Sequence, residues 1–168
     1  MNRLLVLILI IVGHFAFGQN QYPTKSQLLK HLQKNTKRNG RFYNSTKWFT
    51  CKNDSTFYKA DTLEFFNNSN YQNKIHVCDF IDWNFYKRKA FWLQKVQLCK
   101  EPTTASMAKD TYFYTFKIIE DKKSLKLEII RQGTLVDMFE VLSISKFKFG
   151  NQVNDVTDVL TLVRIRKL

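Results

Sequence analysis

Glycine and proline are scarce in this sequence, which has five glycines and two prolines among 168 residues. Their scarcity excludes a collagen-like repeat, and the 15 phenylalanines and seven tyrosines exclude a disordered chain. The sequence also lacks a glycine-rich phosphate loop, a GxSxG nucleophile elbow and an HExxH zinc motif. We therefore expect a folded, non-enzymatic protein with no catalytic residues, no metal site and no cofactor.

Long apolar runs are missing except for one at the N-terminus. Nine uninterrupted apolar residues (4–12) follow the positively charged Arg3, and Ala16-Phe17-Gly18 offers small residues for cleavage before Gln19. The run is too short for a membrane helix, which needs about 20 apolar residues. The pattern predicts a signal peptide over residues 1–18, with an uncleaved anchor as the alternative. The mature protein should then be secreted or periplasmic.

Acidic residues are absent between Gln19 and Asn53, although this segment holds eight basic residues. The N-terminal part, residues 19–40, includes TKSQLLKHLQKNTKRNG, which predicts a short helix with Ser26 as N-cap and Asn39-Gly40 as its end. On such a helix three leucines share one face and three lysines lie opposite. These are Leu28, Leu29 and Leu32, and Lys30, Lys34 and Lys37, respectively. The leucines should dock on the domain while the lysines face outward.

This basic segment allows two interpretations of its charge. A solvated face that keeps the protein soluble is the simpler one. The other is contact with an anionic surface, such as lipid phosphates or acidic polysaccharide of a cell envelope. The candidate contact residues are Lys30, Lys34, Lys37, Arg38 and Arg41. Nucleic acid is not an expected partner, because no nucleic-acid-binding motif accompanies the charge.

From residue 41 to 168 the apolar residues mostly recur at every second position, which is typical of half-buried strands. Eight strands are predicted, at residues 47–52, 56–66, 74–86, 90–100, 111–120, 124–131, 134–146 and 158–167. The connecting segments are mostly short and polar, as between antiparallel neighbours. We therefore expect a mainly all-β domain, an eight-stranded antiparallel up-and-down β-barrel with a short N-terminal helix. A two-sheet sandwich is the alternative.

Trp48 in the first strand, the preceding helix and the closing pattern MFEVLSISKFKF…VLTLVRI resemble the lipocalin-like barrels of small secreted bacterial proteins. The resemblance covers residues 41–168. Thr46 stands where lipocalins carry a glycine, two residues before the tryptophan. The resemblance implies a barrel with a cavity for an apolar small molecule or lipid.

Only three cysteines are present, and two of them flank a predicted hairpin. If this hairpin turns at Arg88-Lys89, paired positions sum to 177 and Cys78 lies opposite Cys99, close enough for a disulfide. Pairings that involve Cys51, or three free thiols, remain alternatives. A metal site of His76, Cys78 and Cys99 would share a face, but its spacing matches no familiar zinc pattern.

The same register predicts which side chains of the hairpin face inward. It places Ile75, Val77, Asp79, Ile81, Trp83, Phe85, Trp92, Val96 and Leu98 on one face. Asp79 is the only charged residue of that face. Together with the alternation in later strands, the pattern gives a set of candidate ligand-binding residues. They are Trp48, Trp83, Phe85, Trp92, Tyr112, Tyr114, Phe116 and Asp79, each of which could equally be ordinary core. The alternative function is a non-enzymatic envelope interaction module that uses its basic helix.

Overall fold

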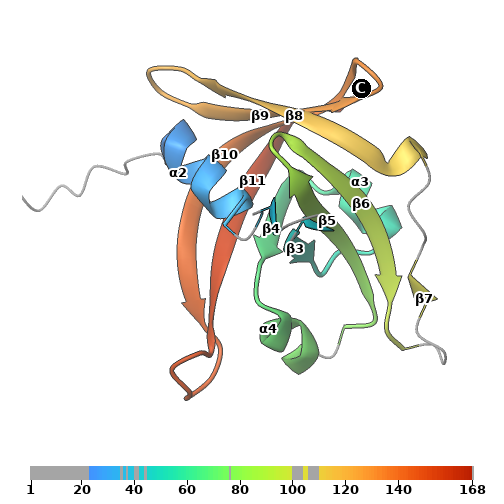
Figure 1. The fold of residues 1–168 in the computed structure, drawn as a ribbon, viewed down its shortest axis with the longest axis vertical. Coiled ribbons are helices and arrows are strands. Elements are labelled where there is room, and N and C mark those ends of the chain that lie inside the picture. The colour runs from blue at the N-terminus through green and yellow to red at the C-terminus, as the bar shows by residue number, and fades with distance from the viewer. Residues whose placement is uncertain are drawn as a thin grey trace, which may run out of the picture.

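The structure is a computed structural model that describes residues 23–34, 36, 38–39, 42–43, 45–75, 77–99, 104–105 and 110–167. Eight strands form a closed antiparallel barrel, so the predicted eight-stranded up-and-down barrel is confirmed (Figure 1). The strands are β3 (Thr46–Thr50), β4 (Thr62–Phe66), β5 (Asp79–Lys87), β6 (Ala90–Gln97), β8 (Phe113–Glu120), β9 (Leu125–Arg131), β10 (Thr134–Lys148) and β11 (Val156–Lys167). The predicted signal peptide, Lys37, Arg41 and His76 lie outside the described residues.

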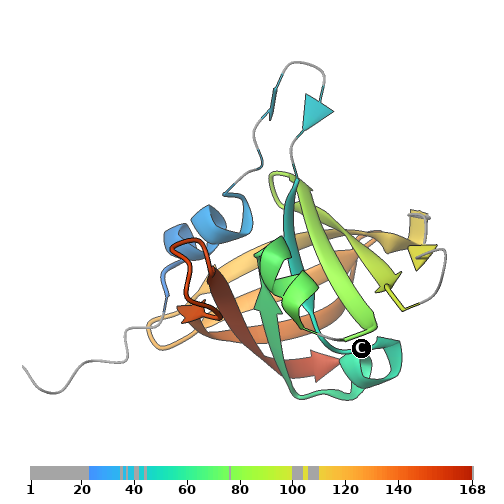
Figure 2. The same ribbon diagram turned by 90° about the horizontal axis from the view of Figure 1, so that it is seen from below.

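Strands that follow one another from β5 to β11 are also neighbours in the barrel. The first two strands are arranged differently, because β3 lies between β4 and β5, and β4 pairs with β11. The pairing of β5 with β6 completes the ring. Two short strands, β1 (Arg38–Asn39) and β2 (Phe42–Tyr43), pair with each other apart from the barrel sheet (Figure 2), and β7 (Thr104–Ala105) adds to the edge of β6.

Helix α2 (Lys25–Leu32) occupies the position of the predicted N-terminal helix. Its N-cap is Thr24, which forms a capping box with Gln27. The prediction of Ser26 as the N-cap was therefore wrong. The helix ends at Leu32 and not at Asn39-Gly40, because Gln33 leaves the helical conformation. The predicted orientation is confirmed, since the side chains of Leu28 and Leu32 are fully buried.

Two further helices precede strands β4 and β5. Helix α3 (Asp54–Lys59) replaces the start of the strand predicted at residues 56–66, whereas α4 (Ser69–Lys74) lies in a predicted connection and overlaps the strand predicted at 74–86 only at Lys74. Asn53 caps α3 by accepting a hydrogen bond from the Thr56 amide, and Asn68 caps α4 in the same way. These local hydrogen bonds outweigh the strand preference of the aromatic and β-branched residues in between.

The β5–β6 hairpin turns at Arg88-Lys89 as predicted, but its register is not the predicted one beyond the first pair. Lys87 pairs with Ala90, and a bulge then shifts the ladder by one residue, so that Phe85 pairs with Phe91 and Asp79 with Gln97. The predicted disulfide between Cys78 and Cys99 is nevertheless present, with 5.0 Å between the two Cα atoms. It forms just beyond the last ladder pair, and Cys51 is a free thiol.

The barrel interior is filled mainly by aromatic and aliphatic side chains. Trp48, Trp83 and Phe65 are among the largest fully or almost fully buried residues of this core. A smaller cluster lies outside the barrel under α4, where the ring of Tyr71 contacts those of Phe49, Phe66 and Phe149. Helix α4 is therefore packed on the barrel wall.

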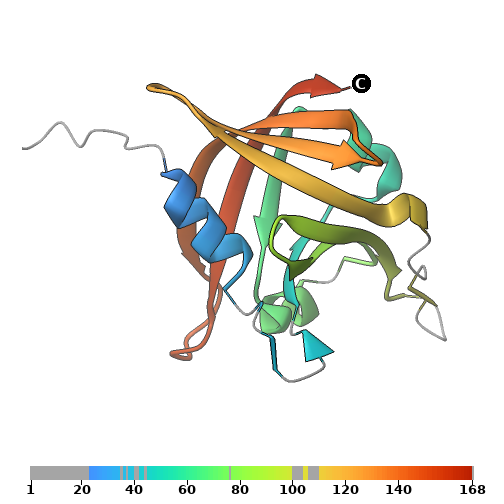
Figure 3. The same ribbon diagram turned by 45° about the horizontal axis from the view of Figure 1, so that its top comes forward.

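Helices α2 and α3 lie at opposite ends of the barrel (Figures 1 and 3). Helix α2 reaches the end formed by the β5–β6 and β8–β9 turns, where the Gln33 side chain donates to the Lys87 carbonyl and the Lys25 amide to Glu120. Helix α3 lies at the end where β9 passes into β10, and Arg164 of β11 donates to its carbonyl groups. Among the described residues, no helix has the length and apolar character needed to span a membrane.

Candidate functional site

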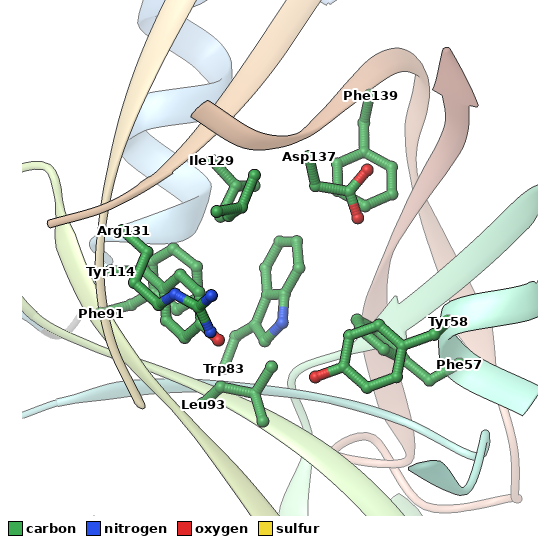
Figure 4. Close-up of a pocket in the computed structure, with 11 residues that line it drawn as sticks. Phe57, Tyr58, Trp83, Phe91, Leu93, Tyr114, Ile129, Arg131, Asp137 and Phe139 are labelled. Atoms are coloured by element: carbon green, nitrogen blue, oxygen red, sulfur yellow. The ribbon is translucent and has the colours of Figure 1, made fainter. Parts of the chain in front are cut away.

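A cavity of about 220 Å³ lies at the α3 end of the barrel (Figure 4). Helix α3 contributes Phe57 and Tyr58 to its wall. The other lining residues come from five barrel strands: Trp83, Phe91, Leu93, Tyr114, Ile129, Arg131, Val136, Asp137 and Phe139. The site therefore combines one short helix with strands that are distant in the sequence.

The deeper wall of the cavity is apolar. Phe57, Trp83, Phe91, Leu93, Ile129 and Phe139 line it, and all six side chains are buried. The aromatic rings of this wall contact one another: the ring centroid of Trp83 lies 4.9 Å from that of Phe91 and 6.0 Å from that of Phe139. Such a surface favours an apolar or aromatic group, because burying its area removes it from water.

Polar groups gather where the cavity meets solvent. Tyr58 and Tyr114 are half-buried and Arg131 is exposed. Figure 4 shows Tyr58 on one side of the cavity, and Tyr114 and Arg131 on the other. Tyr114 is held in place by stacking on Phe91, with 5.4 Å between ring centroids. Burial, together with the nearby Tyr114 and Asp54, raises the pKa of Tyr58 to about 12, so its hydroxyl is a neutral hydrogen-bonding group at physiological pH.

Asp137 also lines the cavity, but its charge is balanced by Arg164. The Arg164 Nε atom lies 3.1 and 3.0 Å from the two carboxylate oxygens of Asp137. Its Nη1 atom donates to the carbonyl groups of Phe57, Tyr58 and Ala60, and the guanidinium lies over the ring of Phe139 at 5.0 Å. The Arg164 side chain is only 6% exposed. One buried arginine thus joins β10, β11 and α3 beside the cavity.

Trp83 lines the cavity with its indole ring, which carries one hydrogen-bond donor. Its side chain is 2% exposed, and its Nε1 atom has no hydrogen-bond partner among the described residues. In Figure 4 the indole occupies the centre of the site, between Arg131 and Tyr58, with the nitrogen on the side toward Tyr58. The Nε1 atom of Trp48 lacks a partner as well, but Trp48 does not line the cavity. An unpaired buried N–H is costly, so an acceptor that reached Trp83 would be stabilised.

Two of the eight candidate ligand-binding residues, Trp83 and Tyr114, line the cavity. Trp48, Phe85 and Phe116 are buried core residues away from it. The other three lie elsewhere in the barrel: Asp79 is the first residue of β5, Tyr112 ends a short 3-10 helix (Asp110–Tyr112), and Trp92 lies on the outer face.

The outward position of Trp92 corrects the predicted inner face of the hairpin. Trp92 pairs with Asn84, and its ring packs on Tyr86 with 5.3 Å between centroids. The bulge between Phe85 and Lys87 is the cause, because a one-residue shift exchanges the two faces of β6 relative to β5. Phe91 and Leu93 take the inward positions instead.

Sequence reasoning missed most of the residues that give the site its character. Phe57 and Tyr58 were assigned to a strand, and Arg131 and Asp137 were not singled out. The only local signal was Asn53, which begins the segment Asn-Asp-Ser-Thr and is a favoured helix N-cap. It could have revealed α3, but it could not have placed α3 over the end of the barrel.

A second buried polar group lies outside the barrel and away from the cavity. Asp82 is 1% exposed and forms an ion pair with Lys47, whose Nζ atom also donates to Gln72 of α4. Burial raises the pKa of Asp82 although Lys47 opposes this shift. The group attaches α4 to β3 and β5, which explains its burial without a functional role.

The predicted contact residues for an anionic surface are only partly described. Lys30 and Lys34 are exposed, and the Nζ atom of Lys34 lies 3.9 Å from a carboxylate oxygen of Asp158. Arg38 is described only as part of β1, and Lys37 and Arg41 lie outside the described residues. Within the described ranges, no group of three or more His, Cys, Asp or Glu side chains is arranged to hold a metal ion.

Comparison of the chain with protein-family models, with curated proteins and with solved structures found no match.

Proposed function

We propose that this protein binds a small, largely apolar molecule in the cavity at the α3 end of its barrel. The observation that carries the proposal is the cavity of about 220 Å³ with buried aromatic walls and a few polar groups at its opening. Ligand sites usually combine a mainly apolar concave surface with a small number of polar groups that fix orientation. An eight-stranded barrel is also large enough to hold one small ligand.

The volume limits the size of the ligand. An apolar cavity of about 150 Å³ is known to hold benzene, whereas sites for drug-sized ligands start at about 300 Å³. The cavity described above lies between these values. A compact molecule with one ring fits this range better than a membrane lipid does.

The disulfide supports a site of action outside the reducing cytoplasm, because structural disulfides persist in oxidising compartments. The N-terminal apolar run of the sequence favours the same interpretation. The proposed setting is therefore a secreted or periplasmic binding protein of the lipocalin-like kind.

The proposal is tested by titrating the protein with indole and with benzyl alcohol in a calorimeter. Val136→Phe places a larger side chain in the cavity wall and should abolish heat of binding. Val153→Phe is the matched control, since Val153 is 93% exposed in the loop between β10 and β11. Binding that is unchanged by Val136→Phe, or the absence of binding by any small aromatic compound to a folded protein, would contradict the proposal.

The alternative function is contact with an anionic envelope surface through α2. Its supporting observation is that the leucine face of α2 is buried, which leaves Lys30 and Lys34 exposed. Replacing both lysines with glutamine should weaken salt-sensitive binding to vesicles that contain anionic lipid. Unchanged binding to such vesicles would rule the alternative out.

A further inference from the structure

We infer that the ligand of the barrel cavity is a small aromatic carboxylate, with its ring against the buried walls and its carboxylate at Arg131. This inference rests on the proposed binding function and adds the chemical class of the ligand. Three features of the site support it: the net charge of its lining, the position of its polar groups, and the unpaired donor of Trp83.

The charge around the cavity favours an anion. Arg131 and Asp137 are the two charged lining residues, and Arg164 pairs with Asp137 through Nε. The carboxylate of Asp137 also accepts a hydrogen bond from the Met138 amide. Among the described residues, Arg131 takes part in none of the ion pairs. The local balance is therefore one uncompensated positive charge, which attracts a ligand anion.

The polar groups are placed for a carboxylate at the opening of the cavity. A guanidinium presents a planar fork of N–H donors that matches the two oxygens of a carboxylate. Tyr114 lines the same side of the site as Arg131 in Figure 4, and its hydroxyl adds a hydrogen-bond donor. The rings of Trp83, Phe91 and Phe139 lie deeper and are buried. A molecule with an aromatic ring at one end and a carboxylate at the other matches this arrangement, in which polar groups lie at the opening and aromatic rings lie deeper.

The indole N–H of Trp83 lies in the cavity wall and is itself fully buried, so a ligand group reaches it only if the ring turns. Because this donor is buried and has no partner among the described residues, an oxygen substituent on the ligand ring that reached it would gain a hydrogen bond without losing another. Among small aromatic carboxylates, the ring-hydroxylated ones should therefore bind more tightly than the unsubstituted parent.

The test compares phenylacetate with phenylacetamide, which has nearly the same shape but no charge. Calorimetric titration should give phenylacetate the lower Kd by about tenfold, equivalent to about 1.4 kcal/mol. The preference should decrease with added salt, because Arg131 is exposed and its charge is screened. At least one of the ortho, meta and para hydroxyphenylacetates should bind more tightly than phenylacetate.

Two matched variants locate the charge effect. Arg131→Gln should raise the Kd of phenylacetate about tenfold and leave that of phenylacetamide nearly unchanged, which removes the preference. Arg88→Gln deletes the same charge in the exposed β5–β6 turn, at the opposite end of the barrel, and should change neither Kd. Tyr114→Phe, which removes one hydroxyl, should weaken phenylacetate binding by a smaller factor.

The outcomes separate the inference from the proposed function. Equal affinities for phenylacetate and phenylacetamide, both lost in Val136→Phe, would overturn the carboxylate class while the binding function stands. An equal loss of preference in Arg88→Gln and Arg131→Gln would overturn the role of Arg131. Binding of neither compound, nor of indole, would refute the binding function itself.

Discussion

The two ends of the barrel are closed by different means. At one end, α2 inserts Leu28 and Leu32, whose side chains are both 0% exposed and do not line the cavity. At the other end, α3 inserts Phe57 and leaves a cavity of about 220 Å³ beside it. The first helix therefore completes the core, whereas the second forms one wall of a site.

The helices are also attached differently. Helix α2 is held by the burial of its leucines and by hydrogen bonds to the barrel, which include the contact of His31 with Asp158 at 3.3 Å and that of Gln33 with the Lys87 carbonyl. Helix α3 has six residues. The carbonyl groups of Phe57 and Tyr58 within it, and of Ala60 just after it, accept hydrogen bonds from Arg164. Helix α3 also packs on the core through Phe57, so the hydrogen bonds from Arg164 add to apolar packing and do not replace it.

The largest expected effect concerns this polar attachment. Arg164→Met should lower the free energy of unfolding by about 3–5 kcal/mol, because it removes the buried arginine that forms an ion pair with the Asp137 carboxylate. The three carbonyl groups at α3 lose their donor at the same time. Urea denaturation monitored by circular dichroism measures the change.

The double variant Asp137→Leu/Arg164→Met provides the control. Removing both charges leaves no buried ion alone, so the double variant should be more stable than Arg164→Met. If the two were equally unstable, the loss would come from the carbonyl contacts of α3 and not from the broken ion pair with Asp137.

At the opposite end, Leu32→Ala should lower the free energy of unfolding by about 2–5 kcal/mol, since it removes a fully buried side chain and leaves a void. Lys30→Ala, on the exposed face of the same helix, should change it by about 0.5 kcal/mol or less. Affinity for small aromatic compounds should stay unchanged in Leu32→Ala, measured well below its melting temperature. A changed affinity would show that the two ends are not independent.

The disulfide between Cys78 and Cys99 lies beside the start of β5 and the end of β6, at the α3 end. The double variant Cys78→Ser/Cys99→Ser should be less stable by about 2–4 kcal/mol, because the bridge closes a loop of 21 residues in the unfolded chain. Reduction of the unmodified protein should give a similar loss in thermal denaturation. An unchanged melting temperature after complete reduction, checked by mass spectrometry, would contradict this expectation.

The barrel could be predicted from the sequence because several of its strands, β9 above all, alternate regularly. Leu125, Leu127 and Ile129 are buried at every second position of β9, and such a pattern fixes both the strand and its inner face. The register of the β5–β6 hairpin was harder to predict, because the amino-acid sequence does not indicate its bulge. The disulfide was predicted correctly on a register that the bulge invalidates, because its cysteines lie beyond the ladder.

The candidate site was less predictable than the barrel. Alternation within a strand can indicate that Trp83 and Tyr114 point inward, but it cannot distinguish a cavity wall from filled core. The difference depends on α3, a six-residue helix that lies across the barrel end and is fixed there by Arg164. Its position results from contacts between residues more than 100 positions apart, which periodicity does not report.

The smallest expected change in the free energy of unfolding concerns the N-cap of α2. Thr24→Ala should lower the free energy of unfolding by about 1 kcal/mol, because the Thr24 side chain accepts a hydrogen bond from the Gln27 amide and completes the capping box. Ser26→Ala is the control: Ser26 lies inside the helix and is exposed, so the change should be near zero or slightly stabilising. The reverse order of the two variants would mean that the helix begins at Ser26. Helix α2 would then begin two residues later than the structure shows.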